Sequence, residues 1–183
     1  MMKAYDRVSW CFLLHVLRRF GFFETWIDAI WLLVSNIWFS VLINGVPQGF
    51  FRSTRGLRQG DPLSPALFVI GAEALSRYLN ALIHQCQFHP YKVSIGCPIV
   101  THMAFADDVV IFTSGLKSTL RVLGRVLQEY CAVSGQKINK QKSCFLLHPG
   151  LSPHRCRIIR HLTRFQRREF PIRYLGCPLF TGR

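Results

Sequence analysis

The adjacent carboxylates Asp107 and Asp108 are the side chains of this sequence best suited to chemistry. They interrupt an otherwise mostly apolar stretch, where charged groups are expensive to place. Carboxylate oxygens are hard ligands of the kind that Mg²⁺ prefers, so the pair is a candidate divalent-metal site. Aspartate is also common in turns. A plain hairpin turn is therefore the alternative, and the pair alone leaves both interpretations open.

The segments around this pair predict how it is held. Met103–Ala106 and Val109–Phe112 are apolar runs that predict a β-hairpin with the two carboxylates at its tip. Ser64 and Pro65 predict the start of a long helix that reaches about Ile83, because serine caps helices and proline fits their first turn. We expect the hairpin to pack against this helix.

The remaining segments alternate between helix and strand signals. Ser9 predicts a helix N-terminus, Thr25 together with Asp28 resembles a capping box, and Asn44-Gly45 predicts a tight turn. The expected helices are 10–20, an apolar helix opened by residue 25, 116–133 and 153–163; the expected strands are 39–43, 46–51, 144–147 and 171–179; and 53–61 is expected to be an exposed loop. This alternation predicts an α+β fold with helices packed on one face of an antiparallel sheet.

The charge of the chain is strongly positive and unevenly distributed. The 183 residues include 23 Lys and Arg against 9 Asp and Glu, which gives a net charge of +14. Residues 1–115 carry a net charge of +2, whereas residues 116–183 carry +12, with seven arginines between Arg155 and Arg173. Such an excess favours a polyanionic partner, nucleic acid first and an anionic membrane second.

The composition excludes some protein classes. Hydrophobic residues make up 50% of the chain, which rules out intrinsic disorder. The apolar run Ala29–Ile43 is shorter than the roughly 20 residues of a membrane span, and no secretory signal is recognised. The seven cysteines are odd in number and form no Cys-x-x-Cys pair. They predict reduced, mostly buried thiols in an intracellular protein.

Five segments, in this order along the chain, resemble the motifs of a known family. They are Lys3–Val8 (KAYDRV), Gly56–Pro65 (GLRQGDPLSP), Phe105–Asp108 (FADD), Ser134–Asn139 followed by Lys142-Ser143 (SGQKIN and KS), and Tyr174–Gly176 (YLG). Each segment is weak evidence alone, but five in register are specific. The chain resembles the reverse transcriptase domain of non-LTR (LINE-type) retrotransposons, especially those abundant in plant genomes.

The resemblance implies a fold and a reaction. Residues 1–147 would form a partial polymerase palm, and residues 148–183 a basic segment that leads into a thumb. The family reaction is RNA-directed DNA synthesis, in which a 3′ oxygen attacks a nucleotide phosphorus with the help of two metal ions, Mg²⁺ or Mn²⁺. The implied partners are an RNA template, a DNA primer and deoxynucleotides. Nucleic acid would also contact basic residues 116–183, and no membrane is expected. Because such elements act at chromosomal DNA, the nucleus is the candidate compartment.

The resemblance also implies roles for single residues. Asp107 and Asp108 would be the catalytic metal ligands, and Lys142 would lie near the leaving pyrophosphate as a cation or an acid. Tyr5 would lie under the incoming sugar. The other implied contacts are with template and nucleotide, through Arg58, Gln59 and Gly60, and with the primer side, through Tyr174, Leu175 and Gly176.

Each of these residues also has an ordinary structural interpretation. Tyr5 could be a core tyrosine, Gln59 and Gly60 a turn before a helix, and Lys142 a solvated loop lysine. The residues alone leave these interpretations open.

The chain departs from the family at its first motif. There the family carries a further catalytic aspartate three residues before the lysine matched by Lys3, a position that would precede Met1, as would the fingers. Asp6 is no obvious substitute, because it lies at the entry to the first helix. We therefore expect a fragment that is inactive alone. A non-catalytic nucleic-acid-binding remnant and an intron maturase-like relative are the alternatives.

Overall fold

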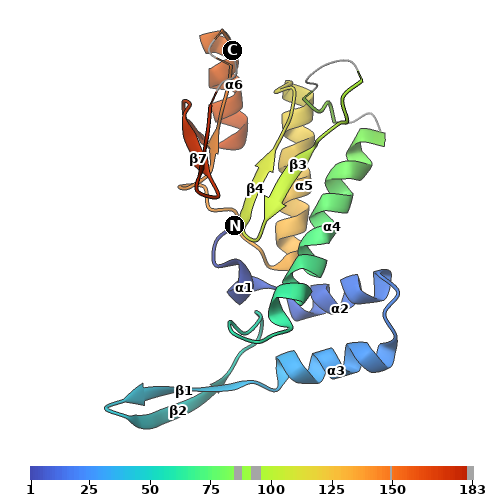
Figure 1. Ribbon diagram of the computed structural model, residues 1–183, viewed down its shortest axis with the longest axis vertical. Helices are drawn as coiled ribbons and strands as arrows, with labels where there is room; N and C mark the ends of the chain where they lie inside the picture. The colour runs from blue at the N-terminus through green and yellow to red at the C-terminus, as the bar shows by residue number, and fades with distance from the viewer. Residues whose placement is uncertain (85–87, 92–95, 149, 181–183) are drawn as a thin grey trace.

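A computed structural model describes residues 1–84, 88–91, 96–148 and 150–180. Two long helices, α4 (Ser64–His84) and α5 (Lys117–Ser134), run side by side through one half of the molecule (Figure 1). The other helices are α1 (Ala4–Arg7), α2 (Trp10–Arg19) and α3 (Glu24–Ser35) near the start of α4, and α6 (Pro153–Thr163) at the opposite end. Helix α2 packs on α3 and α4, and α6 packs on α5.

Most helix ends follow the local chemistry that the sequence predicts. The Ser9 hydroxyl accepts a hydrogen bond from the Phe12 N–H at the start of α2. The Ser152 hydroxyl accepts one from the Arg155 N–H at the start of α6, where proline occupies the first helical position. Helix α5 ends at Gly135, whose φ of 75° is left-handed.

The capping box predicted at Thr25 and Asp28 is wrong. The N-cap lies two residues earlier, because helix α3 begins at Glu24 and Phe23 occupies the N-cap position without a side-chain hydrogen bond. The Phe23 carbonyl accepts the N–H groups of Trp26 and Ile27. Thr25 therefore lies inside the first turn of the helix, where its side chain is not at the capping position.

The strands pair two by two. Three pairs are antiparallel hairpins: β1 (Trp38–Ile43) with β2 (Val46–Arg52), β3 (His102–Phe105) with β4 (Asp108–Ile111), and β7 (Ile172–Tyr174) with β8 (Cys177–Leu179). The fourth pair, β5 (Cys144–Phe145) with β6 (Gln166–Arg167), is parallel. This mixture of helices with small, mainly antiparallel sheets confirms the α+β class.

Two strand predictions differ from the structure. The single strand expected over 171–179 is a hairpin, because Leu175 and Gly176 take positive φ values of 50° and 82° and reverse the chain. The expected antiparallel sheet is not uniform, because Cys144 pairs with Gln166 in parallel. The described strands form four separate two-stranded sheets in place of one sheet with a helical face.

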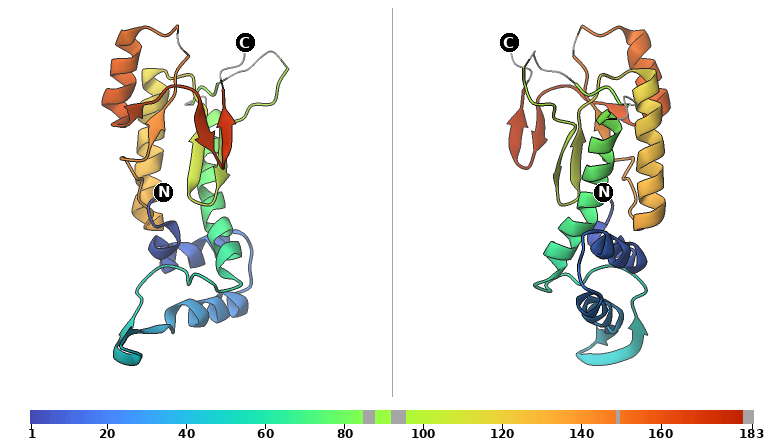
Figure 2. Two further views of the ribbon diagram at one scale, coloured as in Figure 1. Left: turned by 60° about the vertical axis from the view of Figure 1, so that its left-hand side comes forward. Right: turned by 90° about the vertical axis from the view of Figure 1, so that its right-hand side faces the viewer.

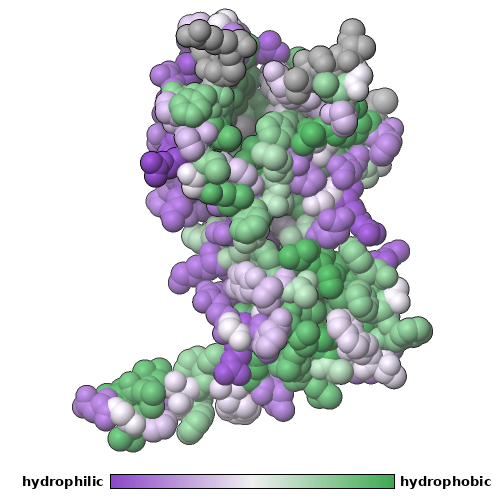
Figure 3. Space-filling model, in the orientation of Figure 1, coloured by the Kyte–Doolittle hydropathy of each residue, from purple (hydrophilic) through white to green (hydrophobic). Residues whose placement is uncertain are grey.

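The hairpins occupy different parts of the molecule. Figure 2 shows α4 and α5 on one side of the β3–β4 hairpin and the β7–β8 hairpin on the other. The β1–β2 hairpin projects beyond α3 at the far end, and all its residues are exposed (Figure 1). Figure 3 shows much of this projection as hydrophobic surface.

Helix α4 links the two clusters of buried side chains that make up the core. One cluster joins its first half to α2 and α3, and the other joins its second half to α5; the largest fully buried side chains include Leu13, Leu17, Ile27, Leu79 and Val126. By length and composition alone, α4 could also cross a membrane. Core helices of soluble proteins pass the same test, so this is weak evidence for a span.

The prediction of mostly buried cysteines is wrong for the six that the structure describes. Cys11, Cys97 and Cys177 are exposed, and Cys131, Cys144 and Cys156 are half-buried. Cys86 lies outside the described residues. Cys11 illustrates the cause, because it shares a face of α2 with the exposed His15 and Arg18 and so points away from the core.

The segment 2–9 is held from two sides, in an arrangement that we call the clasp. On one side, the Gly56 N–H donates to the Val8 carbonyl and the Leu57 N–H donates to the Tyr5 carbonyl, both at 2.8 Å. The Trp10 indole N–H donates to the Gly56 carbonyl at 2.6 Å. The loop before α4 is thus bonded to the N-terminal segment through its backbone.

The other side of the clasp is the chain that leaves α5. Its backbone bonds join Ser9 to Ser134 at 2.8 Å and Met2 to Lys137 at 2.9 Å. The buried Gln136 side chain donates to the Ala4 carbonyl at 2.8 Å. Residues 2–9 are therefore bonded both to the loop before α4 and to the chain at the end of α5.

Gly56 and Gly135 permit this close approach. Both take positive φ values, 91° and 75°, and their backbones touch that of the N-terminal segment. A Cβ atom on Gly56 would lie 2.8 Å from the Asp6 carbonyl oxygen, and one on Gly135 would overlap the Arg7 carbonyl oxygen. Only glycine fits either position without a backbone shift.

We expect Gly135→Ala to lower the free energy of unfolding by about 3 kcal/mol or more. Left-handed backbone costs about 1–2 kcal/mol for a residue with a Cβ, and the overlap with the Arg7 carbonyl adds to this. Gly21→Ala is the matched control, because its φ of 85° is similar but its surroundings are open. Urea unfolding measures both variants, and equal losses would contradict the prediction.

Candidate functional site

The β3–β4 hairpin presents both predicted catalytic carboxylates to solvent. Phe105 pairs with Asp108, and Ala106 and Asp107 form the turn between them. The sequence pattern placed both carboxylates at the tip, whereas Asp108 is the first residue of β4. Ala106 has a φ of 48°, which costs about 1–2 kcal/mol for a residue with a Cβ. The pairing of the two strands maintains this strained turn.

Two polar side chains fix the hairpin to α4. The Thr101 hydroxyl, just before β3, donates to the Asn80 amide oxygen at 2.8 Å. The His102 Nε2 atom lies 2.9 Å from the Ser76 hydroxyl. Ile111 packs against the core cluster between α4 and α5. The expected packing of the hairpin against the helix that begins at Ser64 is confirmed.

The N-terminus lies at the turn of this hairpin. The Met1 ammonium group donates to the Asp107 carbonyl, and the next residue belongs to the clasp. The clasp therefore fixes where the segment bearing Tyr5 and Asp6 lies relative to Asp107.

Tyr5 is positioned as both a core residue and a surface residue. Its ring stacks on Phe68 of α4, with the ring centroids 4.6 Å apart and the planes 9° apart. The residue is half-buried and belongs to the edge of the first core cluster. Tyr5 therefore lies at the edge of the core and is half-buried, which leaves both interpretations of this residue open.

The loop before α4 exposes Arg58, Gln59 and Gly60. The Gln59 amide donates to the Asp6 carboxylate at 3.4 Å, a further link to the clasped segment. Asp61 accepts the Leu63 N–H at 2.8 Å and so closes the loop onto the helix start. The loop is a turn before a helix, and its side chains remain available to a ligand.

Lys142 lies on an exposed turn after α5. The turn is organised by Asn139, whose carbonyl and side-chain oxygen both accept the Lys142 N–H at 3.2 Å. Tyr174 is half-buried, and Leu175 and Gly176 form the exposed β7–β8 turn. Within the described residues, no hydrogen bond or ion pair joins Lys142 or Tyr174 to the β3–β4 hairpin.

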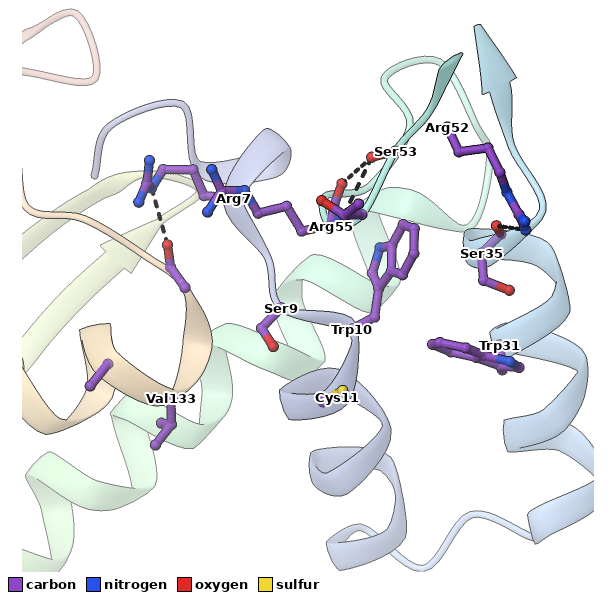
Figure 4. Close-up of a pocket in the computed structure, with 13 residues that line it drawn as sticks. Arg7, Ser9, Trp10, Cys11, Trp31, Ser35, Arg52, Ser53, Arg55 and Val133 are labelled. Atoms are coloured by element: carbon purple, nitrogen blue, oxygen red, sulfur yellow. Dashed lines mark hydrogen bonds between the residues drawn. The ribbon is translucent and has the colours of Figure 1, made fainter. Parts of the chain in front are cut away.

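A hollow of about 640 Å³ lies beside the clasp, and Arg7 and Ser9 of the clasp form part of its wall (Figure 4). Its walls include Trp10 and Trp31, whose rings meet edge to face, and the arginines Arg7, Arg52 and Arg55. Arg7 and Arg52 already donate to the carbonyls of Gly135 and Ser35. The hollow contains none of the site residues predicted from the sequence.

Comparison with known proteins identifies the family. The family described as Reverse transcriptase (RNA-dependent DNA polymerase) matches residues 1–179. The chain belongs to this family. Its members are nucleotidyltransferases that generally use divalent metal ions, and they act on nucleic-acid templates and nucleotides.

The relatives place this reverse transcriptase domain among the non-LTR elements. The chain is 29% identical over 158 residues to a retrovirus-related Pol polyprotein from the type-2 retrotransposable element R2DM of Drosophila melanogaster. That match covers 86% of this chain and 14% of the polyprotein. A Pol polyprotein from the type-1 retrotransposable element R2 of Popillia japonica is 29% identical over 162 residues, covering 79% of this chain and 26% of the polyprotein.

A plant relative has higher identity over a shorter stretch. An uncharacterized mitochondrial protein of Arabidopsis thaliana is 43% identical over 75 residues, which cover 41% of this chain and 62% of that protein. The chain thus spans less than two thirds of each of these relatives. The resemblance to the reverse transcriptase domain of a non-LTR element is confirmed.

The reverse transcriptase domain depends on residues to which the sequence pattern gave no such role. The buried Gln136 side chain donates a hydrogen bond to the Ala4 carbonyl through its amide nitrogen. Its side-chain amide oxygen, Oε1, has no hydrogen-bond partner. Gly56 and Gly135 make the close backbone contacts of the clasp. All three residues lie inside the motifs that resemble the family. The sequence does not show, however, which distant backbone a loop glycine will contact.

The donor set at the hairpin fits a divalent ion that is shared with substrate. Asp107 and Asp108 offer two exposed carboxylates, and Mg²⁺ is usually bound through one or two carboxylates together with substrate phosphates and waters. Across residues 1–84, 88–91, 96–148 and 150–180, no group of three or more His, Cys, Asp and Glu side chains is gathered to hold a metal. The arrangement therefore differs from a metal site in which protein side chains supply all the ligands.

Acid should weaken the attachment of the hairpin to α4. Burial lowers the pKa of His102 below its usual value of 6.5, although Glu73 acts in the opposite direction. The unfolded chain therefore takes up a proton more readily than the folded protein does, so the free energy of unfolding should fall as the pH drops below about 6.5. We expect His102→Gln to flatten this fall, as measured by urea unfolding at a series of pH values.

The exposed His15 on α2 provides the control for this experiment. His15→Gln should retain the pH dependence of the original protein. A His102→Gln variant with an unchanged pH dependence would contradict the assignment.

Proposed function

We propose that this domain supplies the metal-binding hairpin and part of the nucleotide-facing surface of a polymerase palm that performs RNA-directed DNA synthesis. One observation carries the proposal: two exposed carboxylates on a helix-anchored hairpin lie beside the clasped segment that bears Tyr5. In this proposal, residues 1–147 form a partial palm and residues 148–183 lead into a thumb.

Asp107 and Asp108 would hold the divalent ion, Mg²⁺ or Mn²⁺. When bound, such an ion stabilises negative charge on the attacking and leaving oxygens of phosphoryl transfer. The hairpin contributes rigidity, because its strands are paired and its base is bonded to Ser76 and Asn80. Rigid support matters because misplacement by about 1 Å can cost on the order of 100-fold in rate.

The remaining residues would bind and orient nucleic acid and nucleotide. The Tyr5 ring cannot turn freely, because it is stacked on Phe68, so it can limit the space available to a 2′-OH, the group that separates RNA from DNA. Lys142 would offer a cation or a proton to the leaving pyrophosphate. Arg58, Gln59 and Gly60 would face template and nucleotide, and Tyr174, Leu175 and Gly176 would face the primer.

A second candidate function is nucleic-acid binding without catalysis. It is favoured by the charge of residues 116–183, which carry a net +12 and include the whole of α5 and α6. A basic surface of this kind binds phosphate backbones whether or not the hairpin holds a metal. Metal binding and primer extension therefore separate the two candidates.

Metal binding at the hairpin should depend on both carboxylates. We expect Asp107→Asn and Asp108→Asn each to reduce Mn²⁺ affinity by about tenfold or more, which corresponds to ~1.4 kcal/mol. Asp28→Asn, at an exposed carboxylate on α3, is the control and should leave affinity unchanged. Mn²⁺ titration followed by electron paramagnetic resonance measures all three. Equal affinity in every variant would rule out this metal site.

Polymerisation should require more than the two hairpin carboxylates. We expect residues 1–183 alone to give no primer extension on an RNA template, because no third acidic or histidine ligand is gathered near the pair among the described residues. A version extended N-terminally with the further aspartate of the family's first palm motif should extend the primer. Asp107→Ala/Asp108→Ala in that version should not. Extension by residues 1–183, lost in the double variant, would contradict the expectation of inactivity.

A further inference from the structure

One face of α6 gathers cations at its C-terminal end. Arg157, Arg160, His161 and Arg164 are spaced so that they share a face of the helix, and all four are exposed. Together with Phe165 and Gln166 they line a shallow hollow of about 390 Å³. The opposite face is anchored, since Ile159 is buried and α6 packs on α5.

None of these four side chains has an acidic partner. Within the described residues the ion pairs are Arg18–Glu24, Arg77–Glu73 and Arg167–Glu169, and no acidic side chain lines the hollow. Three of them are arginines, which stay charged at any ordinary pH. The α6 dipole favours cations at this end, but only by about 0.3–1 kcal/mol each. The positive charge is therefore free for an external anion.

The backbone turns sharply at the same place. Arg164 takes a left-handed φ of 60°, and its N–H donates to the Arg160 carbonyl at 2.9 Å. The Thr163 hydroxyl donates to the Ile159 carbonyl and accepts the Phe165 N–H. This turn brings the half-buried Phe165 ring back beside the last turn of α6 and leads into β6, which is paired with β5. The cations and the ring are thus held on fixed elements.

We propose that this face of α6, with Phe165, binds the phosphate backbone of a nucleic-acid strand. Arg157 and Arg164 are separated by about 10 Å along the helix axis, so the row can contact successive phosphates of one strand. Arginine is well shaped for bidentate contacts with phosphate, and an aromatic ring beside the cations can stack on a base. The inference rests on the proposed function and locates one backbone contact of its nucleic acid within the basic region 116–183.

The test is the salt dependence of binding to labelled single-stranded oligodeoxythymidylate, measured without divalent metal by fluorescence anisotropy. Each phosphate contact contributes a log–log slope of about −0.7 on single strands. The triple variant Arg157→Gln/Arg160→Gln/Arg164→Gln should therefore bind more weakly and lose about 2 from the magnitude of the slope. A Phe165→Leu variant should weaken binding while leaving the slope unchanged.

The neighbouring helix provides a matched control. Lys117, Arg121 and Arg125 also form an exposed row of three cations, on α5, and Lys117→Gln/Arg121→Gln/Arg125→Gln removes the same charge. We expect this control to change the slope much less than the α6 variant. Equal changes would overturn the proposal in favour of diffuse attraction to the basic region. Far-ultraviolet circular dichroism and unfolding of each variant verify that the fold is intact.

The remaining outcomes separate this inference from the proposed function. If the original protein binds the oligonucleotide with a steep slope and the α6 variant behaves identically, the inference fails while the proposed function stands. If no binding is seen even at low salt, the inference fails, and so does the part of the proposed function that requires nucleic-acid binding. Binding to vesicles of anionic phospholipid in place of the oligonucleotide would also overturn the inference. Mn²⁺ binding at Asp107 and Asp108 should be the same in the α6 variant, because the two sites share no residue.

Discussion

The structure depends on the clasp around residues 2–9. Ala4 and Val8 of this segment reach the core, but α1 within it has only four residues, too few for a helix that is stable alone. It is ordered because backbone groups on both sides bond it, from Gly56 and Leu57 before α4 and from Ser134 to Lys137 after α5. The bonds to Gly56 and Leu57 span 48 and 52 residues of sequence, and those to residues 134–137 span 125 or more.

The clasp also relates the parts of the candidate site to one another. Met1 reaches the turn of the β3–β4 hairpin, while Tyr5 stacks on α4 and Asp6 meets Gln59. The hairpin is independently bonded to α4 through Thr101 and His102. Helix α4 is thus the common support. Its burial on two sides allows an exposed, charged hairpin to be held without burying its carboxylates.

The surface chemistry is divided between the two ends of the molecule. At the α6 end the surface carries unpaired arginines, whereas the β1–β2 hairpin at the other end is exposed and largely hydrophobic. Cationic and apolar surfaces favour different partners, since phosphates are attracted over long distances and apolar groups act only in contact. The carboxylate hairpin lies between these two regions (Figure 1).

The sequence by itself determined the features that depend on local chemistry. Ser9 and Ser152 cap their helices as predicted, Asn44-Gly45 forms the expected turn, and the apolar runs beside Asp107 and Asp108 form a hairpin. The motif order was also sufficient to identify the reverse transcriptase family. In each case, the physical cause lies within a few residues of the feature.

Only the tertiary structure decided the features that depend on contacts between distant segments. Two local features also differ from the prediction: Thr25 does not cap α3, because the helix begins at Glu24, and residues 171–179 fold back at Leu175. Cys11 is exposed because its face of α2 does not meet the core. Gly56 and Gly135 are required as glycines because the backbone of the N-terminal segment occupies the space that a Cβ atom would need. That information is carried by packing between segments and is invisible in the pattern of any one of them.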